Sequence, residues 1–324
     1  MVSDGEPAAP LPPAVVLTGP TAAGKTGVAL TLARRLPVRI VSVDSAQVYR
    51  GLDIGSAKPD AATLERFPHA LIDIRNPEEA YSAAEFAADC EQAMRSAWDS
   101  GRMPLLVGGT TLYLRALLYG LDPMPPADPA VRRRIASAAA RRGWGALHAK
   151  LARLDPVTAD AIAVGDTQRI QRALEILELT GQPPSRLRRG NRIPRIDSLR
   201  LVLTPSSRHV LHQRIDQRLD QMIENGLIDE VAGLRQRNHL SLDVPSMRSV
   251  GYRQVWQYLD GSIDRTRMRL DAATATRRLA KRQLTALRQV SNSLWYDPDR
   301  AGSTERICLQ VEKFIRRFSH TAPR

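Results

Sequence analysis

The first part of the chain alternates short apolar runs with longer amphipathic runs. Three apolar runs predict buried strands, at residues 14–17, 39–44 and 103–107. Three runs with apolar side chains at helical spacing predict helices, at residues 28–36, 81–100 and 110–119. Strands and helices in alternation are typical of a parallel sheet with helices on both faces, so the sequence predicts an α/β fold.

The alternation stops near residue 122, and a segment without strands follows. Residues 122–129 have the proline-rich composition of a linker. Four helical segments come next, at residues 131–142, 145–154, 156–162 and 168–179. Because residues 199–203 look like a strand that rejoins the sheet, we interpret residues 124–196 as an all-helical insertion domain. The core then consists of residues 14–123 and 197–324, and residues 1–13 are expected to be a flexible tail.

Two long helices are expected after the insertion. The first carries Leu211, Ile215 and Leu219 on one stripe. The second spans about residues 267–294, and its cations fall within about 140° of arc, opposite apolar side chains. These cations are Arg277, Arg278, Lys281, Arg282 and Arg288. Clustered like charges repel one another, so we favour a phosphate backbone as their partner over a merely solvated surface.

The net charge of +13 is unevenly distributed along the chain. Residues 1–127 contain 11 Lys and Arg against 14 Asp and Glu, a net charge of −3. Residues 128–324 contain 36 against 20, a net charge of +16. A basic half joined to a mildly acidic half indicates a polyanionic partner. Arginine outnumbers lysine 42 to 5, so the base composition of the genome is the alternative explanation of this charge.

Composition argues against a membrane or secreted protein. No apolar run approaches the roughly 18 residues of a membrane span, and the N-terminus resembles neither a signal nor a transit peptide. Two isolated cysteines, Cys90 and Cys308, fit a reducing cytosol and lack metal-binding spacing. His209 and His212 have no further ligands nearby, which favours a surface or packing role. We therefore expect a cytoplasmic protein without a membrane partner.

Residues 19–26 carry the strongest single motif, Gly-Pro-Thr-Ala-Ala-Gly-Lys-Thr, between a predicted strand and a predicted helix. This context is that of a P-loop, in which glycines turn backbone N–H groups toward an anion at a helix N-terminus. Lys25 adds a mobile charge, and Thr26 offers a hydroxyl to Mg²⁺. The motif predicts that a diphosphate or triphosphate binds here. A glycine turn with a surface lysine is the alternative.

Asp44 follows the second predicted strand and begins the polar segment Asp-Ser-Ala-Gln-Val-Tyr-Arg. In a P-loop ATPase or kinase, an acid at such a place holds Mg²⁺. The carboxyl edge of the sheet is also where α/β proteins bind ligands, and an acid there can instead remove a proton from a nucleophile. Geometry decides between these roles, so the sequence leaves both open.

Seven segments form a recognisable set. They are residues 19–26, 44–49 (Asp-Ser-Ala-Gln-Val-Tyr), 53–59 (Asp-Ile-Gly-Ser-Ala-Lys-Pro), 108–113 (Gly-Gly-Thr-Thr-Leu-Tyr), 166–175 (Asp-Thr-Gln-Arg-Ile-Gln-Arg-Ala-Leu-Glu), 248–253 (Arg-Ser-Val-Gly-Tyr-Arg) and 281–288 (Lys-Arg-Gln-Leu-Thr-Ala-Leu-Arg). The set resembles the bacterial tRNA dimethylallyltransferases, in order, from about residue 15 to residue 296. Many families share the P-loop, but the set of seven is specific. The resemblance implies a P-loop NTPase-like parallel sheet flanked by helices.

The resemblance also implies a reaction. A dimethylallyl group is transferred from dimethylallyl diphosphate to N6 of the adenine next to the anticodon of tRNA (position 37). Diphosphate leaves, N6-isopentenyladenosine forms, and ATP is not consumed. The implied partners are tRNA and dimethylallyl diphosphate, the implied cofactor is Mg²⁺, and we expect a monomer.

Roles for individual residues follow from the same resemblance. Asp44 is expected to be the general base at N6, and Thr110 is expected near the reacting centre, which is compatible with an N-cap role for Thr110. The diphosphate is expected to contact Gly19, Thr21, Ala22, Ala23, Gly24, Lys25, Thr26 and Arg214. For Arg214 an ion pair on the long helix is the alternative.

Contacts with tRNA are implied for residues from several segments. They are Asp44, Ser45, Ala46, Gln47, Arg132, Gln168, Arg169, Ile170, Gln171, Arg172, Arg248, Gly251, Tyr252, Arg253, Lys281, Arg282, Gln283 and Arg288. For each arginine alone, a solvated surface charge is the alternative. A stacked adenine must be extruded to reach Asp44, and contacts of the basic half with the RNA backbone would offset that cost.

Three residues depart from the family pattern. Ala286 stands where Trp is usual, Ala70 replaces a second His, and Thr167 replaces Pro, but none lies in the P-loop or at Asp44. Other functions stay open: a P-loop kinase for a small metabolite, or a non-catalytic RNA-binding protein with a relic loop. A prenyltransferase for free adenine nucleotides is a third, although it should not need residues 128–196 or the basic last helix.

Overall fold

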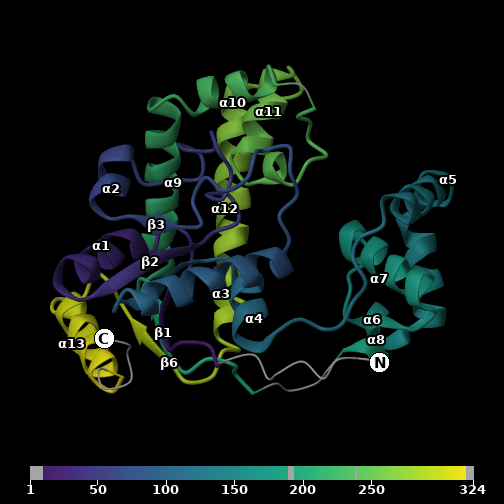
Figure 1. The fold of residues 1–324 in the computed structure, drawn as a ribbon. Helices are drawn as coiled ribbons and strands as arrows, with labels where there is room; N and C mark the ends of the chain where they lie inside the picture. Colours follow the sequence, from purple (N-terminus) through teal and green to yellow (C-terminus); the bar gives the residue numbers. More distant parts are fainter. Residues whose placement is uncertain (1–9, 189–192, 238, 319–324) are drawn as a thin grey trace. The chain divides into compact units, whose positions relative to one another are not determined.

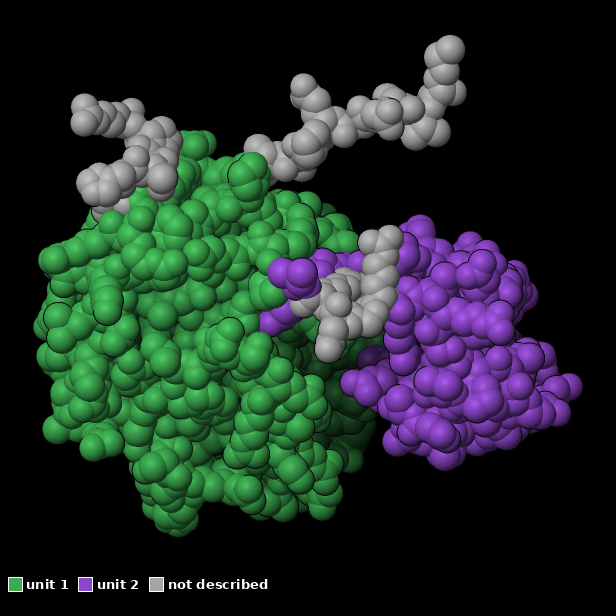
Figure 2. Space-filling model, turned by 90° about the horizontal axis from the view of Figure 1, so that it is seen from below, with its two compact units in different colours: residues 1–118, 194–324 green, residues 119–193 purple. Residues whose placement is uncertain are grey.

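The computed structural model describes residues 10–188, 193–237 and 239–318. The chain divides into two compact units: Met1–Leu118 with Pro194–Arg324, and Tyr119–Ile193 (Figure 2). Most of the predicted tail, residues 1–9, lies outside the described residues. Among the described helices, none is long and apolar enough to cross a membrane.

The first unit is built on a parallel sheet (Figure 1). Within the described residues its strands are β1 (Ala14–Thr18), β2 (Val38–Val43), β3 (His69–Ala70), β4 (Met103–Gly108), β5 (Ser198–Leu203) and β6 (Ser293–Tyr296). Their order is β3-β2-β4-β1-β5-β6, and Leu17 of β1 pairs with Val107 of β4 and Leu201 of β5. The connection from β1 to β2 passes over β4, and the connection from β4 to β5 passes over β1. The ligand crevice of such a sheet is expected at the carboxyl ends of β1 and β4.

Helices cover both faces of the sheet, as the alternating pattern predicts. Helices α1 (Lys25–Arg35) and α13 (Ser303–Arg316) share one apolar cluster with alternate strand residues such as Val15, Leu17 and Leu105. On the other face, α3 (Ala83–Asp99) packs on β2 and β4. Tyr113 of α4 (Thr111–Tyr119) stacks on Phe86 of α3, with ring centroids 4.3 Å apart. The short helix α2 (Ala61–Arg66) precedes β3.

The remaining helices of this unit pack on one another. They are α9 (Arg208–Glu224), α10 (Leu227–Arg235), the 3-10 turn η1 (Ser246–Arg248), α11 (Tyr252–Leu259) and α12 (Arg265–Leu287). Leu211 and Ile215 of α9 and Ala280 of α12 form an apolar cluster that also takes in Ala22 of the P-loop. The helical pair α9–α12 therefore holds the P-loop against the sheet.

The C-terminal part of the chain differs from the sequence prediction. The basic helix ends at Leu287 rather than near residue 294, because Ser291-Asn292-Ser293 interrupts it and Asn292 takes a positive φ of 56°. The apolar spacing of Val290 and Leu294 suggested a continuing helix. Leu294 instead belongs to β6, in a segment of strand-favouring Trp and Tyr. Helix α13 follows β6, and it was not predicted from the sequence.

The second unit is helical within its described residues. It contains α5 (Pro129–Leu154), α6 (Pro156–Asp160), α7 (Thr167–Thr180) and α8 (Pro184–Leu187). Gly143, with a φ of 77°, interrupts α5, so the two predicted helices at 131–142 and 145–154 are confirmed. Its core includes Val131, Ile135, Leu151 and Ile170.

Glu175 organises this helical unit from within its core. The side chain is fully buried; Oε1 accepts hydrogen bonds from Arg132 Nε at 2.9 Å and from the backbone N–H of Asp128 at 2.8 Å. Oε2 accepts one from Arg172 Nη1 at 2.7 Å. Burial opposes ionisation of Glu175, but these hydrogen bonds outweigh it and hold its pKa below the usual range. The two arginines and the helix start at Asp128 thus share one anion.

We expect Glu175→Ala to destabilise this unit by about 3–5 kcal/mol, because it leaves two arginines without their buried partner. Denaturant unfolding measures the loss. The pKa of Glu175 is lowered on folding, so its contribution is present above the unfolded pKa and disappears as pH falls through the folded pKa. Glu178→Ala is the matched control: Glu178 pairs with Arg134 on the surface, and its loss should change stability far less. Equal losses in both variants would contradict the assignment.

Candidate active site

The P-loop joins β1 to α1 at the carboxyl edge of the sheet. Gly19 has a φ of 151°, and a Cβ there would lie 2.2 Å from the carbonyl oxygen of Leu203 in β5. Only glycine tolerates this approach. Gly24, with a φ of 80°, is the N-cap of α1, and Ala22 also has a positive φ, of 62°. The predicted residues 19–26 therefore form one turn around a helix N-terminus, an arrangement that binds anions.

The ammonium group of Lys25 folds back on this loop. Nζ donates hydrogen bonds to the carbonyl oxygens of Gly19 at 3.0 Å and Pro20 at 2.7 Å. Burial lowers the pKa of Lys25 to about 8; the charge of Asp44 opposes this effect, and the charge of Arg218 adds to it. A desolvated cation of this kind gains stability when an anion binds, so its position suits a ligand phosphate.

Asp44 follows β2 and closes a tight turn. Its Oδ1 accepts hydrogen bonds from the backbone N–H groups of Ala46 at 2.8 Å and Gln47 at 3.3 Å. Such a turn fixes the direction of the carboxylate. The hydroxyl of Thr110 accepts a hydrogen bond from the backbone N–H of Ser45 at 3.1 Å. The structure thus brings the two predicted catalytic residues, Asp44 and Thr110, together through Ser45.

Gln283 of α12 ties two loops of the site together. Its Oε1 accepts a hydrogen bond from the backbone N–H of Thr21 at 2.9 Å, and its Nε2 donates one to the carbonyl oxygen of Gly109 at 2.9 Å. A Cβ on Gly109 would lie 2.5 Å from Nε2, which explains glycine at this position. The sequence predicts a tRNA contact for Gln283, whereas here both ends of its amide bind the loops.

Two arginines of α9 depart from the prediction. Arg214, the expected diphosphate ligand, forms an ion pair with Asp299, which is the alternative role considered for it. Arg218 lies one turn further along the same helix. Its pKa is lowered by burial, against the opposing charge of Asp44, and its own charge lowers the pKa of Lys25. Arg218 is therefore the second cation of the site; its spacing of four residues from Arg214 was the only sequence signal for it.

A cavity of about 550 Å³ opens beside Arg218. Segment 53–64 and α9 contribute its walls, which include the apolar side chains of Ile54, Leu64 and Met222. Met222 follows Arg218 by four residues on α9, so a cationic and an apolar side chain succeed each other along one helix face. The acids Asp53, Asp60 and Asp73 and the cation Lys58 also line this cavity, so its walls are partly charged.

Comparison with known proteins accounts for this arrangement. The sequence model of the IPP transferase family matches residues 47–290. The chain belongs to this family. It is 57% identical over 288 residues to a tRNA dimethylallyltransferase of Thiobacillus denitrificans, covering 89% of this chain and 92% of that protein.

Solved structures agree with the family assignment. A tRNA isopentenylpyrophosphate transferase from Bacillus halodurans is 36% identical with a TM-score of 0.69, covering 95% of this chain and 98% of that one. A eukaryotic dimethylallyltransferase acting on tRNA has a TM-score of 0.75 at 23% identity, covering 94% of this chain and 80% of that one, and it shows the shared fold. The predicted fold class and the recognised family are confirmed.

Several residues with predicted tRNA contacts lie on the surface of this IPP transferase. The side chains of Lys281 and Arg282 on α12 and of Arg288 at its C-cap are exposed, and so are those of Arg248 and Arg253. Their roles stay predictions. Arg277 differs from its neighbours on the predicted arc, because its Nη2 pairs with Asp216 of α9 at 2.6 Å. This cation contributes to helix packing.

Three further residues with predicted tRNA contacts are buried in this structure, and their roles stay predictions. Tyr252 and Ile170 are fully buried, and Gly251 is buried too. The apolar and small residues of these segments serve packing, and only their polar neighbours reach solvent. On α7, Gln168 and Arg169 are exposed.

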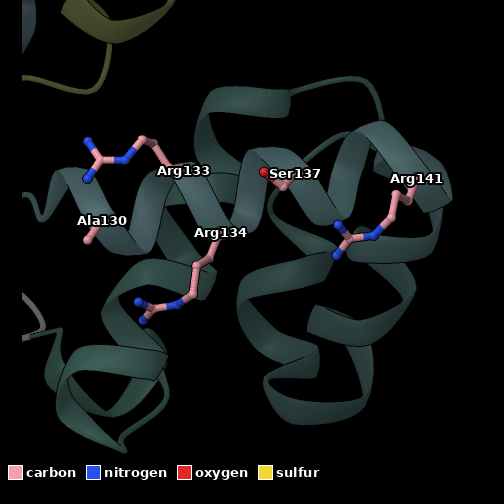
Figure 3. A pocket seen from close by; sticks show the side chains of 5 residues that line it. All are labelled: Ala130, Arg133, Arg134, Ser137 and Arg141. Carbon is pink, nitrogen blue, oxygen red and sulfur yellow. The ribbon is translucent and has the colours of Figure 1, made fainter.

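The remaining predicted residues of the helical unit bind within it. Arg132 and Arg172 pair with Glu175, and Gln171 Nε2 donates to the carbonyl oxygen of Arg132 at 3.1 Å. The surface of α5 carries a separate row of cations, Arg133, Arg134 and Arg141, around a shallow pocket with Ser137 (Figure 3). This row was not predicted from the sequence.

The residues at the P-loop fit the expected Mg²⁺. Thr26 is exposed at the start of α1, directly after Lys25. Among the described residues, no group of three or more His, Cys, Asp or Glu side chains could hold a metal ion. Mg²⁺ commonly binds through substrate phosphates, waters and one or two protein groups, so Thr26 with a bound diphosphate suffices.

Lys25→Ala should weaken dimethylallyl diphosphate binding and slow transfer more than it weakens binding, because charge on the leaving group grows along the reaction. A bound anion raises the pKa of Lys25 from about 8, so wild-type affinity should fall as pH rises above about 8. Titration calorimetry at several pH values measures the affinity and its pH dependence, and single-turnover kinetics measure the transfer rate. The ionisation of the diphosphate is common to both proteins and cancels in the comparison. Loss of tRNA affinity alone would remove the P-loop from the diphosphate site.

Proposed function

We propose that this chain transfers a dimethylallyl group from dimethylallyl diphosphate to N6 of the adenine next to the anticodon of tRNA. The observation that carries the proposal is the P-loop of an IPP transferase, where Lys25 folds back on the loop and the charge of Asp44 acts on both Lys25 and Arg218. Two cations suit a leaving diphosphate, and the acid suits proton removal. We further expect the enzyme to act as a cytoplasmic monomer.

In this reaction the bond between C1 of the dimethylallyl group and the diphosphate oxygen breaks, and a bond from N6 to C1 forms. Asp44 accepts the proton that N6 loses, which raises the reactivity of a poor nucleophile. Lys25, Arg218 and the P-loop N–H groups stabilise the negative charge that grows on the diphosphate. Thr26 would hold Mg²⁺, and the ion would add positive charge there.

The anionic backbone of tRNA provides a partner for two basic surfaces. One is the exposed side of α12 with Arg278, Lys281, Arg282 and Arg288. The other is the arginine row of α5 in the helical unit (Figure 3). A metabolite kinase would leave both surfaces without a role, and so would a prenyltransferase acting on free nucleotides.

The function is tested by incubating the protein with bulk unmodified tRNA, Mg²⁺ and labelled dimethylallyl diphosphate, followed by nucleoside analysis. Label should appear as N6-isopentenyladenosine in tRNA. Incubation with ATP alone should release no phosphate above background. ATP turnover without prenylated adenine would establish the kinase alternative, and label in added AMP would establish the free-nucleotide alternative.

Asp44→Asn keeps the size of the side chain and removes its basicity. The single-turnover rate at saturating substrates should fall by about 10²–10⁴-fold, the usual contribution of a general base. Binding of tRNA should change little, because a single acid contributes no attraction to a polyanion. A rate within a few-fold of wild type would exclude Asp44 as the base.

The cations of α12 should act through phosphates. Each phosphate contact contributes about −0.7 to −0.9 to the slope of log K against log salt, so Arg278→Gln, Lys281→Gln and Arg288→Gln together should flatten it by about two units. Arg277 is left intact because it pairs with Asp216. The same charge change at Arg306, Lys313 and Arg316 of α13 is the control and should leave the slope unchanged. Equal slopes for the α12 variant and wild type would indicate that tRNA phosphates contact another surface, and the α5 row is the next candidate.

A further inference from the structure

We propose that Glu230 of α10 is a positioning residue for the transfer reaction, because it fixes the segment that holds the turn of Asp44. The proposal rests on the proposed function, in which Asp44 is the base. Glu230 is distant from Asp44 in sequence and belongs to a helix outside the sheet (Figure 1). A chain of hydrogen bonds connects the two.

The carboxylate of Glu230 is saturated by one short stretch of backbone and one side chain. Oε2 accepts the backbone N–H groups of Asp53 at 3.1 Å and Ile54 at 2.7 Å. Oε1 accepts the backbone N–H of Gly55 at 3.2 Å and the hydroxyl of Tyr252 at 2.6 Å. Four donors thus converge on a group that only accepts, and only an ionised carboxylate can satisfy all of them.

Tyr252 holds the same stretch from the other side. Its ring is fully buried, and a Cβ on Gly55 would lie 2.6 Å from it. Burial raises the pKa of Tyr252, and the charge of Glu230 raises it further, so the hydroxyl remains a donor to Glu230. Backbone 53–55 is therefore clamped between a carboxylate and an aromatic ring, which explains both the glycine and the tyrosine at these positions.

Gln47 connects the clamped backbone segment to Asp44 through hydrogen bonds. Its Nε2 donates hydrogen bonds to the carbonyl oxygens of Ala57 at 3.2 Å and Ser56 at 3.4 Å, directly after the clamped stretch. Its Oε1 accepts one from the hydroxyl of Ser42 in β2 at 3.0 Å. The backbone N–H of the same Gln47 bonds Oδ1 of Asp44. The place of Asp44 thus depends on Gln47, and the place of Gln47 depends on the segment that Glu230 holds.

Lys58 anchors the far end of the segment. Its ammonium is almost fully buried, pairs with Asp53 and Asp73, and donates to the carbonyl oxygen of Tyr49 at 2.9 Å. Because Tyr49 belongs to the chain that leaves the Asp44 turn, segment 53–58 is tied to that turn at two points. The remaining edge of the segment faces α10, where Glu230 accepts hydrogen bonds from the backbone N–H groups of residues 53–55.

The test compares Glu230→Gln with a control variant that removes a similar carboxylate acceptor elsewhere in the structure. In Glu230→Gln an amide NH₂ replaces one acceptor and faces two donors, so the segment must shift while the volume of the side chain is kept. Glu78→Gln is the control, because Glu78 also accepts two hydrogen bonds, from Arg237 at 2.8 and 3.0 Å, but is not bonded to segment 53–58 in the structure. Tyr252→Phe removes a single donor and keeps the ring that packs on Gly55.

Displacement of a catalytic group by about 1 Å can cost about 10²-fold in rate. We expect Glu230→Gln to lower the single-turnover rate at saturating tRNA and dimethylallyl diphosphate by about 10- to 100-fold, and Tyr252→Phe by less. The KM for dimethylallyl diphosphate should stay within about two-fold of wild type, since Lys25 and the P-loop have no bond to the segment. Glu78→Gln should match the wild-type rate.

An Asp44→Asn background separates positioning from stability. If Glu230 acts through Asp44, Glu230→Gln should lower the residual rate of Asp44→Asn by less than about two-fold, because the group that it positions is already inactive. A full additional loss in that background would overturn the proposal, and so would a wild-type rate for Glu230→Gln. If Glu230→Gln fails to fold, as judged by its thermal midpoint, Tyr252→Phe carries the same comparison. A wild-type protein that transfers no label would instead defeat the proposed function itself.

Discussion

Direct backbone contact at the carboxyl ends of the strands is the constraint on which the site depends. Gly19 packs on the carbonyl of Leu203, and a Cβ on Gly108 would lie 2.0 Å from the carbonyl oxygen of Val43. The chain leaves β1, β2 and β4 at nearly the same point as a result. The P-loop, the Asp44 turn and the Thr110 segment are therefore brought within hydrogen-bond reach of shared side chains, among them Gln283. A side chain at either glycine would separate these loops before it affected any catalytic group.

The charges of the site fit a ligand that is anionic at one end. Lys25 is bonded to carbonyl oxygens of its own loop and is partly deprotonated by burial near pH 8, while Arg218 stays close enough to influence it. Two desolvated cations beside one acid are electrostatically incomplete, and an anionic ligand such as a diphosphate would supply the missing negative charge. Asp44 alone can compensate only one of them. The same reasoning explains why Arg214, which already has Asp299 as its partner, is the poorer candidate for the diphosphate.

Local patterns predicted the parts of the molecule that depend on neighbouring residues. Apolar spacing predicted strands β1, β2, β4 and β5, the main helices and even the break at Gly143, and the motif around Lys25 predicted the phosphate loop. What escaped was determined by contacts between distant segments. Arg218 is recognised only by its proximity to Asp44, and Glu230 only by the N–H groups of residues 53–55. The arginine row of α5 also escaped, because it lies outside the family segments. Tyr252 shows a different limit: its ring is buried, and a family segment does not tell which of its side chains face outward.

The two hydrogen bonds of the Gln283 side-chain amide limit how this protein can vary during evolution. Its amide spans the P-loop and Gly109, while Lys281 and Arg282 beside it face solvent on the same helix. Substitutions at the outer positions leave helix α12 in register. A single residue inserted between Ala280 and Gln283 would turn the amide by about 100° about the helix axis and break both bonds at once. This helix can therefore accept replaced side chains more readily than an insertion before Gln283, and its exposed cations keep a fixed distance from the phosphate loop.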